Sequence, residues 1–145
     1  MRKEKVEFEI LIRVPRERVF QSIATSEGLD EWFTDGTSLE AGPGGEICFR
    51  WKNWGLQKYS GEYPGQVIEI NPPSRFVFQW MADSGGYYST AEFDFTQVDE
   101  GTIVRIVEHG FTSNPEGLQD LLNRTSGWAH VLTLLKFYLE HGETY

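Results

Sequence analysis

A long helix is predicted for the C-terminal part of the chain, from Pro115 to His141. Asn114 is a favourable N-cap, Pro115 suits the first helical position because no N–H is needed there, and Gly142 is a typical C-terminal stop. The helix would be roughly 27 residues long, more than twice the average of about 11 or 12. A helix of this length must lie across most of the remaining structure of so small a protein.

One face of this helix is strongly apolar, and the opposite face carries His130, Thr133 and Phe137. At 100° per residue the apolar residues form a stripe, which predicts a helix packed along one side. The stripe consists of Leu121, Thr125, Trp128, Leu132, Leu135 and Leu139, with Val131 and Tyr138 beside it.

The rest of the chain is predicted to form mainly strands, because apolar and polar residues alternate with a period of two. The first strand covers residues 6–14, and two short helices follow, one after Pro15 and one at about residues 26–32, with Ser26 as a possible cap. The later strands are expected around residues 47–51, 59–70, 76–80, 87–95 and 104–106.

A sheet with one apolar face needs a cover, and only the long helix could cross most of the strands. The sequence therefore predicts an α+β fold in which a curved antiparallel sheet of six to seven strands wraps a long C-terminal helix. At 145 residues, the chain is expected to form a single domain, residues 1–145.

The charge of the chain argues against several classes of partner. Its formal net charge of −9 opposes binding to nucleic acids and to anionic membranes, since both rely on Lys and Arg. The N-terminal residues carry charges where a signal peptide would be apolar, and one cysteine cannot form an internal disulfide. We expect a cytoplasmic protein that binds neither nucleic acid nor membrane.

Two charged residues interrupt the inward faces. Arg124 lies near the helix stripe, one turn before Trp128, and Glu108 shares a strand face with Val104 and Ile106. Both lie near the ends of their elements, which favours contact with solvent. The alternative is that they pair in a shared interior, because an unpaired buried charge is costly.

A few polar groups among inward-facing aromatics are typical of a small-molecule pocket. Aromatics of this kind more often only fill a core, so both interpretations remain open. The candidate ligand-binding residues are Phe49, Trp51, Phe78, Trp80, Tyr87, Glu108, Arg124 and Trp128.

The sequence carries no recognisable catalytic or metal-binding motif. The three histidines lack the spacing of metal ligands, and no nucleophile motif occurs. We therefore assign no catalytic residue, metal or cofactor, although Glu108 could act as an acid or base with Arg124 steering a carbonyl or anionic group.

Four segments, "EWFTDGTSLEAGPGGEICFRW", "QVIEINPPSRFVFQW", "GTIVRIVEHGF" and "SGWAHVLTLLKFYLEHG", resemble homologues of the activator of the heat-shock protein 90 ATPase. These belong to the START-like, or birch-pollen-allergen-like (SRPBCC), superfamily. The resemblance implies a helix-grip fold with a cavity between helix and sheet. It also implies a possible chaperone as partner, and the superfamily includes ligand binders, cyclases and hydrolases.

Together these observations favour non-catalytic binding of a small hydrophobic molecule between the C-terminal helix and the sheet, in a stress-related role. The first alternative is a protein-interaction module or chaperone cofactor that uses surface aromatics such as Phe137. The second is an enzyme of the cyclase or hydrolase type.

Overall fold

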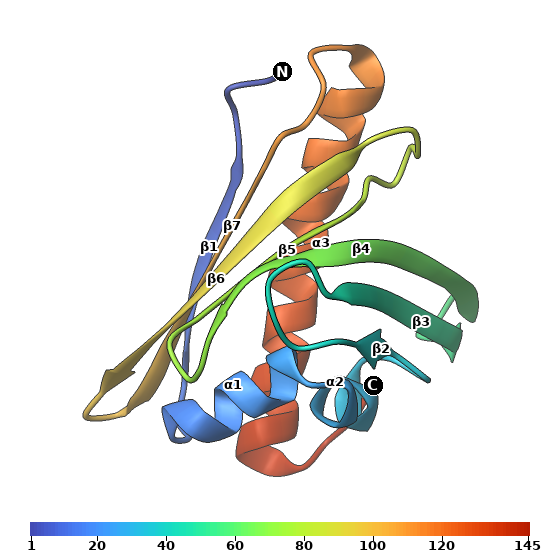
Figure 1. Ribbon diagram of the computed structural model, residues 1–145. Coiled ribbons are helices and arrows are strands. Elements are labelled where there is room, and N and C mark those ends of the chain that lie inside the picture. The colour runs from blue at the N-terminus through green and yellow to red at the C-terminus, as the bar shows by residue number, and fades with distance from the viewer.

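The computed structural model describes all residues 1–145, and it confirms the predicted α+β helix-grip fold (Figure 1). Strand β1 is followed by helices α1 and α2, six further strands and the long helix α3. The elements are β1 (Val6–Ile12), α1 (Arg16–Ala24), α2 (Ser26–Trp32), β2 (Ser38–Leu39), β3 (Glu46–Trp54), β4 (Tyr59–Asn71), β5 (Arg75–Met81), β6 (Tyr88–Val98), β7 (Gly101–His109) and α3 (Pro115–His141).

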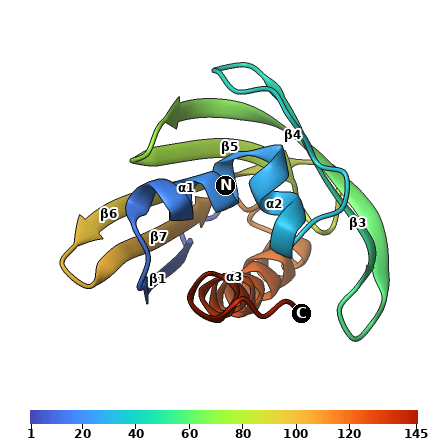
Figure 2. The same cartoon turned by 90° about the horizontal axis from the view of Figure 1, so that it is seen from below.

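All strands belong to one antiparallel sheet in the order β1-β7-β6-β5-β4-β3-β2. Consecutive strands from β2 to β7 pair with each other, and β1 pairs with β7 at the other edge of the sheet. The register shifts between Trp51 and Trp54 and between Val67 and Glu69. Because such irregularities bend and twist a strand, they help the sheet to arch over α3 (Figure 2).

Helix α3 has the predicted bounds and caps. The Asn114 side chain accepts a hydrogen bond from the Gly117 N–H at 2.8 Å, and Gly142 adopts the left-handed conformation with φ 75°. Trp128, Leu132 and Leu135 are buried, as their place on the stripe predicts.

The predicted stripe is wrong at one position, because Thr125 is exposed. Arg124 occupies the inner face there, since it lies four residues, or one turn, before Trp128. A second correction concerns α2, whose N-cap is Thr25 rather than Ser26. The Thr25 hydroxyl accepts from the Gly28 N–H at 2.9 Å.

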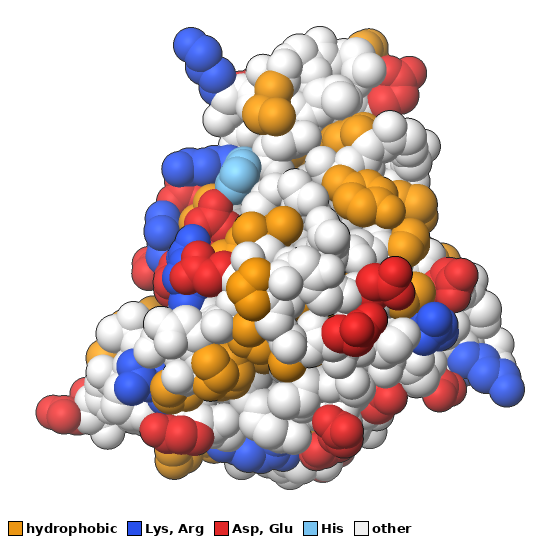
Figure 3. Space-filling model, viewed as in Figure 1, with side chains coloured by type: hydrophobic (Ala, Val, Ile, Leu, Met, Phe, Trp, Pro, Cys, Tyr) orange, Lys and Arg blue, Asp and Glu red, His pale blue; other side chains and the backbone are white.

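The outer face of the sheet carries paired charges. Arg75 contacts Glu92 and Asp94 across neighbouring strands, and Arg105 contacts Glu7. Lys, Arg, Asp and Glu side chains accordingly lie together over the region of β1, β7 and β6 (Figure 3). Mutually neutralising surface charges of this kind do not form a patch of one sign.

Helix α3 lies unevenly against the sheet. Its backbone approaches β1 most closely, whereas β3 and β4 curve away from it (Figure 2). The distance between the α3 backbone and the sheet backbone therefore increases like a wedge towards β3 and β4. On that wide side, large side chains bridge the helix and the sheet. This geometry determines where the interior is filled and where it is open.

Candidate functional site

A cavity of about 200 Å³ lies on the wide side of the wedge. The wall formed by the sheet comes from β3, β4 and β5, and the opposite wall comes from α3. Seven aromatic rings dominate the lining, with three polar side chains among them. The lining residues are Phe33, Trp51, Trp54, Tyr59, Tyr63, Trp80, Asp83, Asn123, Arg124, Gly127, Trp128 and Val131.

A broader depression of about 540 Å³, here called the vestibule, continues this cavity outward. It adds exposed residues of the β3–β4 turn, among them Leu56 and Gln57. The residues that it shares with the cavity are Trp54, Tyr59, Tyr63, Asp83 and Gly127. A small molecule could therefore reach the aromatic walls from solvent without opening the sheet.

Glu108 lies directly behind the cavity and has no exposed surface. Its Oε1 accepts from the Trp128 indole N–H at 2.7 Å, and its Oε2 accepts from the Trp80 indole N–H at 2.9 Å. Ser89 and Arg124 also donate to Oε2. Four donors from two strands and α3 thus converge on one carboxylate, which can only accept hydrogen bonds.

Arg124 is the matching cation, and all of its donors are engaged. A guanidinium has five N–H groups. Nη1 donates to Glu108 and to Ser89, Nη2 donates to the Met81 carbonyl at 2.7 Å and to Asp83 at 3.2 Å, and Nε donates to Asp83 at 3.3 Å. The Arg124 Cζ lies 4.2 Å from the centroid of the Trp80 ring. Arg124 therefore has no free donor for an anionic ligand.

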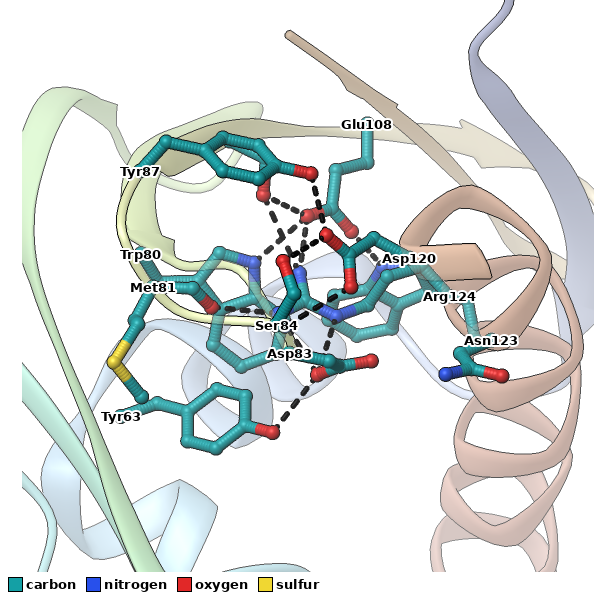
Figure 4. A network of polar contacts seen from close by, with 12 residues as sticks. Tyr63, Trp80, Met81, Asp83, Ser84, Tyr87, Glu108, Asp120, Asn123 and Arg124 are labelled. Atoms are coloured by element: carbon teal, nitrogen blue, oxygen red, sulfur yellow. Dashed lines mark hydrogen bonds and ion pairs between the residues drawn. The ribbon is translucent and has the colours of Figure 1, made fainter. Parts of the chain in front are cut away.

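The expectation that Glu108 and Arg124 reach solvent is wrong. Glu108 stands at the end of β7, but Trp80 on β5 and Trp128 on α3 both donate to its carboxylate. Arg124, also on α3, lies beside it (Figure 4). The pair faces a shared interior, which was the alternative. Two oppositely charged groups can be buried in this way because each satisfies the other.

A second carboxylate, Asp83, projects from the turn between β5 and β6 at the cavity mouth. Its Oδ1 accepts from the Tyr63 hydroxyl at 2.8 Å and from Arg124. Its Oδ2 makes no hydrogen bond within the protein and points away from the network (Figure 4).

The turn that carries Asp83 is fixed to α3 by a third carboxylate, that of Asp120. This carboxylate accepts from the Ser84 N–H at 3.0 Å, from the Ser84 hydroxyl at 2.6 Å and from the Tyr87 hydroxyl at 2.6 Å. These bonds join the turn and the helix, so they hold Asp83 in place beside the cavity.

Burial, and next the hydrogen bond to Asp83, raise the pKa of Tyr63 well above its usual value near 10. In the unfolded chain Tyr63 ionises near pH 10, whereas in the fold it keeps its proton. Its contribution to stability is therefore complete below about pH 10 and is lost as the pH rises further. We expect the free energy of unfolding to fall less steeply between pH 9 and 11 in Tyr63→Phe than in the wild type.

Urea unfolding at a series of pH values would measure this difference. Tyr88→Phe is a suitable control, because Tyr88 is 48% exposed. An equal alkaline slope in the wild type and Tyr63→Phe would contradict the prediction.

The eight candidate ligand-binding residues occupy different places. Trp51, Trp80, Arg124 and Trp128 line the cavity. Glu108 lies behind them, and the Tyr87 hydroxyl bonds to Asp120. Phe49 and Phe78 lie deeper, around a void of only about 10 Å³. Such a void is no larger than one water molecule, so this inner part is packed core.

Several lining residues were not identified from the sequence. Tyr59 and Tyr63 lie four residues apart along β4, and Tyr63 contacts Trp51, so the period-two rule could have placed both tyrosines on the inward face. No local pattern marks Asp83, in "ADSGG", or Asp120, on the predicted helix, as a site residue. Their roles depend on contacts between distant segments, which no local pattern reveals.

The arrangement offers little to catalysis at Glu108. The carboxylate is fully buried, four donors occupy it, and it is not among the residues that line the cavity. No group of three or more His, Cys, Asp and Glu side chains is arranged to hold a metal ion. None of the helices is both long and apolar enough to cross a bilayer.

Comparison with known proteins adds a family and a set of similar folds. The sequence profile described as "Activator of Hsp90 ATPase homolog 1-like protein" matches residues 13–140. No curated protein matches the chain.

Two solved structures illustrate the similarity of fold. A protein from Staphylococcus saprophyticus is 25% identical, with a TM-score of 0.78 and coverage of 98% of this chain and 96% of that one. A protein described as the Aha1 dimer from Colwellia psychrerythraea is 23% identical, with a TM-score of 0.76 and coverage of 97% and 98%.

Proposed function

The chain belongs to the Activator of Hsp90 ATPase homolog 1-like family, and within that family we propose that it binds a small, largely apolar molecule without transforming it. The ligand would occupy the aromatic cavity between α3 and strands β3 to β5. The vestibule would be its route of entry.

The observation that carries this proposal is an open aromatic space beside an otherwise packed interior. Keeping about 200 Å³ unfilled has a cost in stability, because lost packing destabilises by roughly 24 cal/mol per Å³ in cavity-forming variants. Part of the cavity is open to solvent, so its cost in stability is smaller than this value per Å³ would give for a closed cavity. Even so, the deeper core around Phe78 shows that this chain can pack tightly where no space is needed.

A second observation is a buried donor without an acceptor. The Trp51 Nε1–H is inaccessible and has no hydrogen-bond partner in the protein, and the Trp51 ring lines the cavity. A buried unpaired N–H costs about 1–3 kcal/mol. A ligand that shifted a neighbouring ring could bring an oxygen atom to this N–H and remove that cost, which favours a ligand with at least one acceptor.

The tryptophans allow a direct test by NMR. Four of the five indole N–H groups, those of Trp51, Trp54, Trp80 and Trp128, belong to rings that line the cavity, whereas Trp32 does not line it. On titration with 2-naphthol, a neutral aromatic with one oxygen, we expect saturable shifts of the cavity signals and little change at Trp32. No saturable shift at any cavity tryptophan, either with 2-naphthol or with the cationic, neutral and anionic probes described below, would overturn the proposal.

A chaperone cofactor is the second candidate, and family membership is the observation that favours it. Phe137 and Leu122 are half exposed on α3 and could contact a partner. Adding the protein to a heat-shock protein 90 chaperone should then raise the rate of ATP hydrolysis, and Phe137→Ser should reduce that stimulation. An unchanged ATPase rate would count against this candidate.

A further inference from the structure

Four aromatic rings that line the cavity, here called the box, are those of Trp51, Trp54, Tyr59 and Tyr63. Trp51 is inclined at 84° to Tyr63 and at 57° to Tyr59, with ring centroids 5.5 and 5.8 Å apart. Trp54 adds a wall inclined at 76° to Phe33. The faces of aromatic rings carry partial negative charge, and such boxes attract cations, above all substituted ammonium groups.

The fixed charges beside the box leave an excess of one negative charge. Arg124 contributes the one guanidinium, and Glu108 and Asp83 contribute two carboxylates. Neither the cavity nor the vestibule is lined by a lysine. Because one carboxylate already neutralises Arg124, a cation entering the box would meet an attractive field.

The hydrogen-bonding groups of the site also favour a positively charged ligand. All five Arg124 donors are used within the protein, so no fixed cation is available for an anionic group. By contrast, the Asp83 Oδ2 is a charged acceptor at the mouth with no donor from the protein (Figure 4). The site can thus accept a positive group but has little to offer a negative one.

We propose that the ligand is a small organic cation, with a substituted ammonium group held in the box of Trp51, Trp54, Tyr59 and Tyr63 beside Asp83. This inference rests on the proposed binding function and specifies the chemical class of its ligand. The remaining ring surfaces of Phe33 and Trp128 would contact the apolar part of the molecule.

Three probes of similar shape and different charge can test the inference. Benzyltrimethylammonium is cationic, neopentylbenzene replaces its nitrogen by carbon, and phenylmethanesulfonate carries a negative tetrahedral group. We expect the cation to bind at least tenfold more tightly than the neutral probe, and the anion to bind most weakly. The indole N–H signals of the cavity tryptophans give the three dissociation constants.

Two variants separate the contributions of charge and ring. Asp83→Asn should weaken binding of the cation about tenfold and leave the neutral probe almost unaffected. Tyr59→Leu removes one ring face at a residue that is already 41% exposed, so folding should be preserved, and it should also weaken the cation more than the neutral probe.

The control is Asp99→Asn, which changes the net charge equally but lies in the β6–β7 turn, at the opposite end of β6 from Asp83. Its effect measures the general attraction of a chain with net charge −9 for any cation. An equal loss of affinity in Asp83→Asn and Asp99→Asn would overturn the role of Asp83.

The outcomes distinguish this inference from the function on which it rests. If neopentylbenzene binds as tightly as the cation, the proposal of a cationic ligand is wrong, and the proposed binding function stands. If 2-naphthol binds and none of the three probes binds, the proposal of a cationic ligand is again wrong, and the proposed binding function again stands. If neither 2-naphthol nor any of the three probes shifts the cavity signals, both proposals are overturned.

Discussion

Replacing Glu108 by leucine is expected to lower the free energy of unfolding by about 3–5 kcal/mol, because breaking a buried ion pair is strongly destabilising and only the partly exposed Asp83 would then compensate Arg124. Arg124 would remain almost fully buried, and the indole N–H groups of Trp80 and Trp128 would lose their acceptor. Small proteins are stable by only about 5–15 kcal/mol in total, so the loss would be large.

The same pair can be tested with a double-mutant cycle. In Glu108→Leu/Arg124→Met both charges are absent, so the double variant should be clearly more stable than the sum of the two single effects predicts. Urea unfolding of the wild type and the three variants measures the coupling free energy. Additive losses would show that the two residues act independently.

An exposed pair provides the control for this cycle. Glu7 and Arg105 form an ion pair whose side chains are each more than two-fifths exposed. Glu7→Gln should change the free energy of unfolding by no more than about 0.5 kcal/mol, since exposed pairs contribute little. A comparable loss in Glu7→Gln and Glu108→Leu would contradict the special role of the buried pair.

Replacing Gly127 by leucine should strongly weaken ligand binding while leaving the fold intact. Gly127 lies on α3 where the cavity meets the vestibule, and an added Cβ would meet no atom within 4 Å. A leucine side chain would therefore project into open space and occupy the place of a ligand. We expect the dissociation constant for 2-naphthol to rise at least tenfold.

The stability of this variant separates binding from folding. Glycine within a helix is less favourable than alanine or leucine by up to about 1 kcal/mol, so Gly127→Leu should be as stable as the wild type or more stable. Gly127→Ala is the matched control, which should gain similar stability and keep most of the binding. Undiminished binding to a folded Gly127→Leu variant would place the ligand elsewhere.

The elements of the fold were predictable because their signals are local. Asn114, Pro115 and Gly142 determine the ends of α3 through contacts within one turn of the helix. The strands follow from alternation along short segments, although the two-residue strand β2 is too short to give such a signal. Each of these features depends on residues that are close together in sequence.

The site was predictable only in part, because its key contacts join distant segments. The sequence identified Glu108 and Arg124 as inward-facing charges, but their pairing depends on where α3 lies relative to β7. The position of Asp83 depends on Asp120, 37 positions further along the chain, holding the turn. Whether aromatics fill a core or line a cavity depends on the distance between α3 and β3, which sequence periodicity does not contain.

The rings of Phe33 and Trp128, each of which lines both spaces, divide the interior into two compartments. On one side lies tightly packed core around Phe49 and Phe78, and on the other lies the cavity. Side chains such as Tyr59 and Asn123 face only the second compartment and are exposed at its rim. They can therefore be exchanged with little effect on the core, so the shape and charge of the cavity can be altered by substitution, in the laboratory or in evolution, separately from folding.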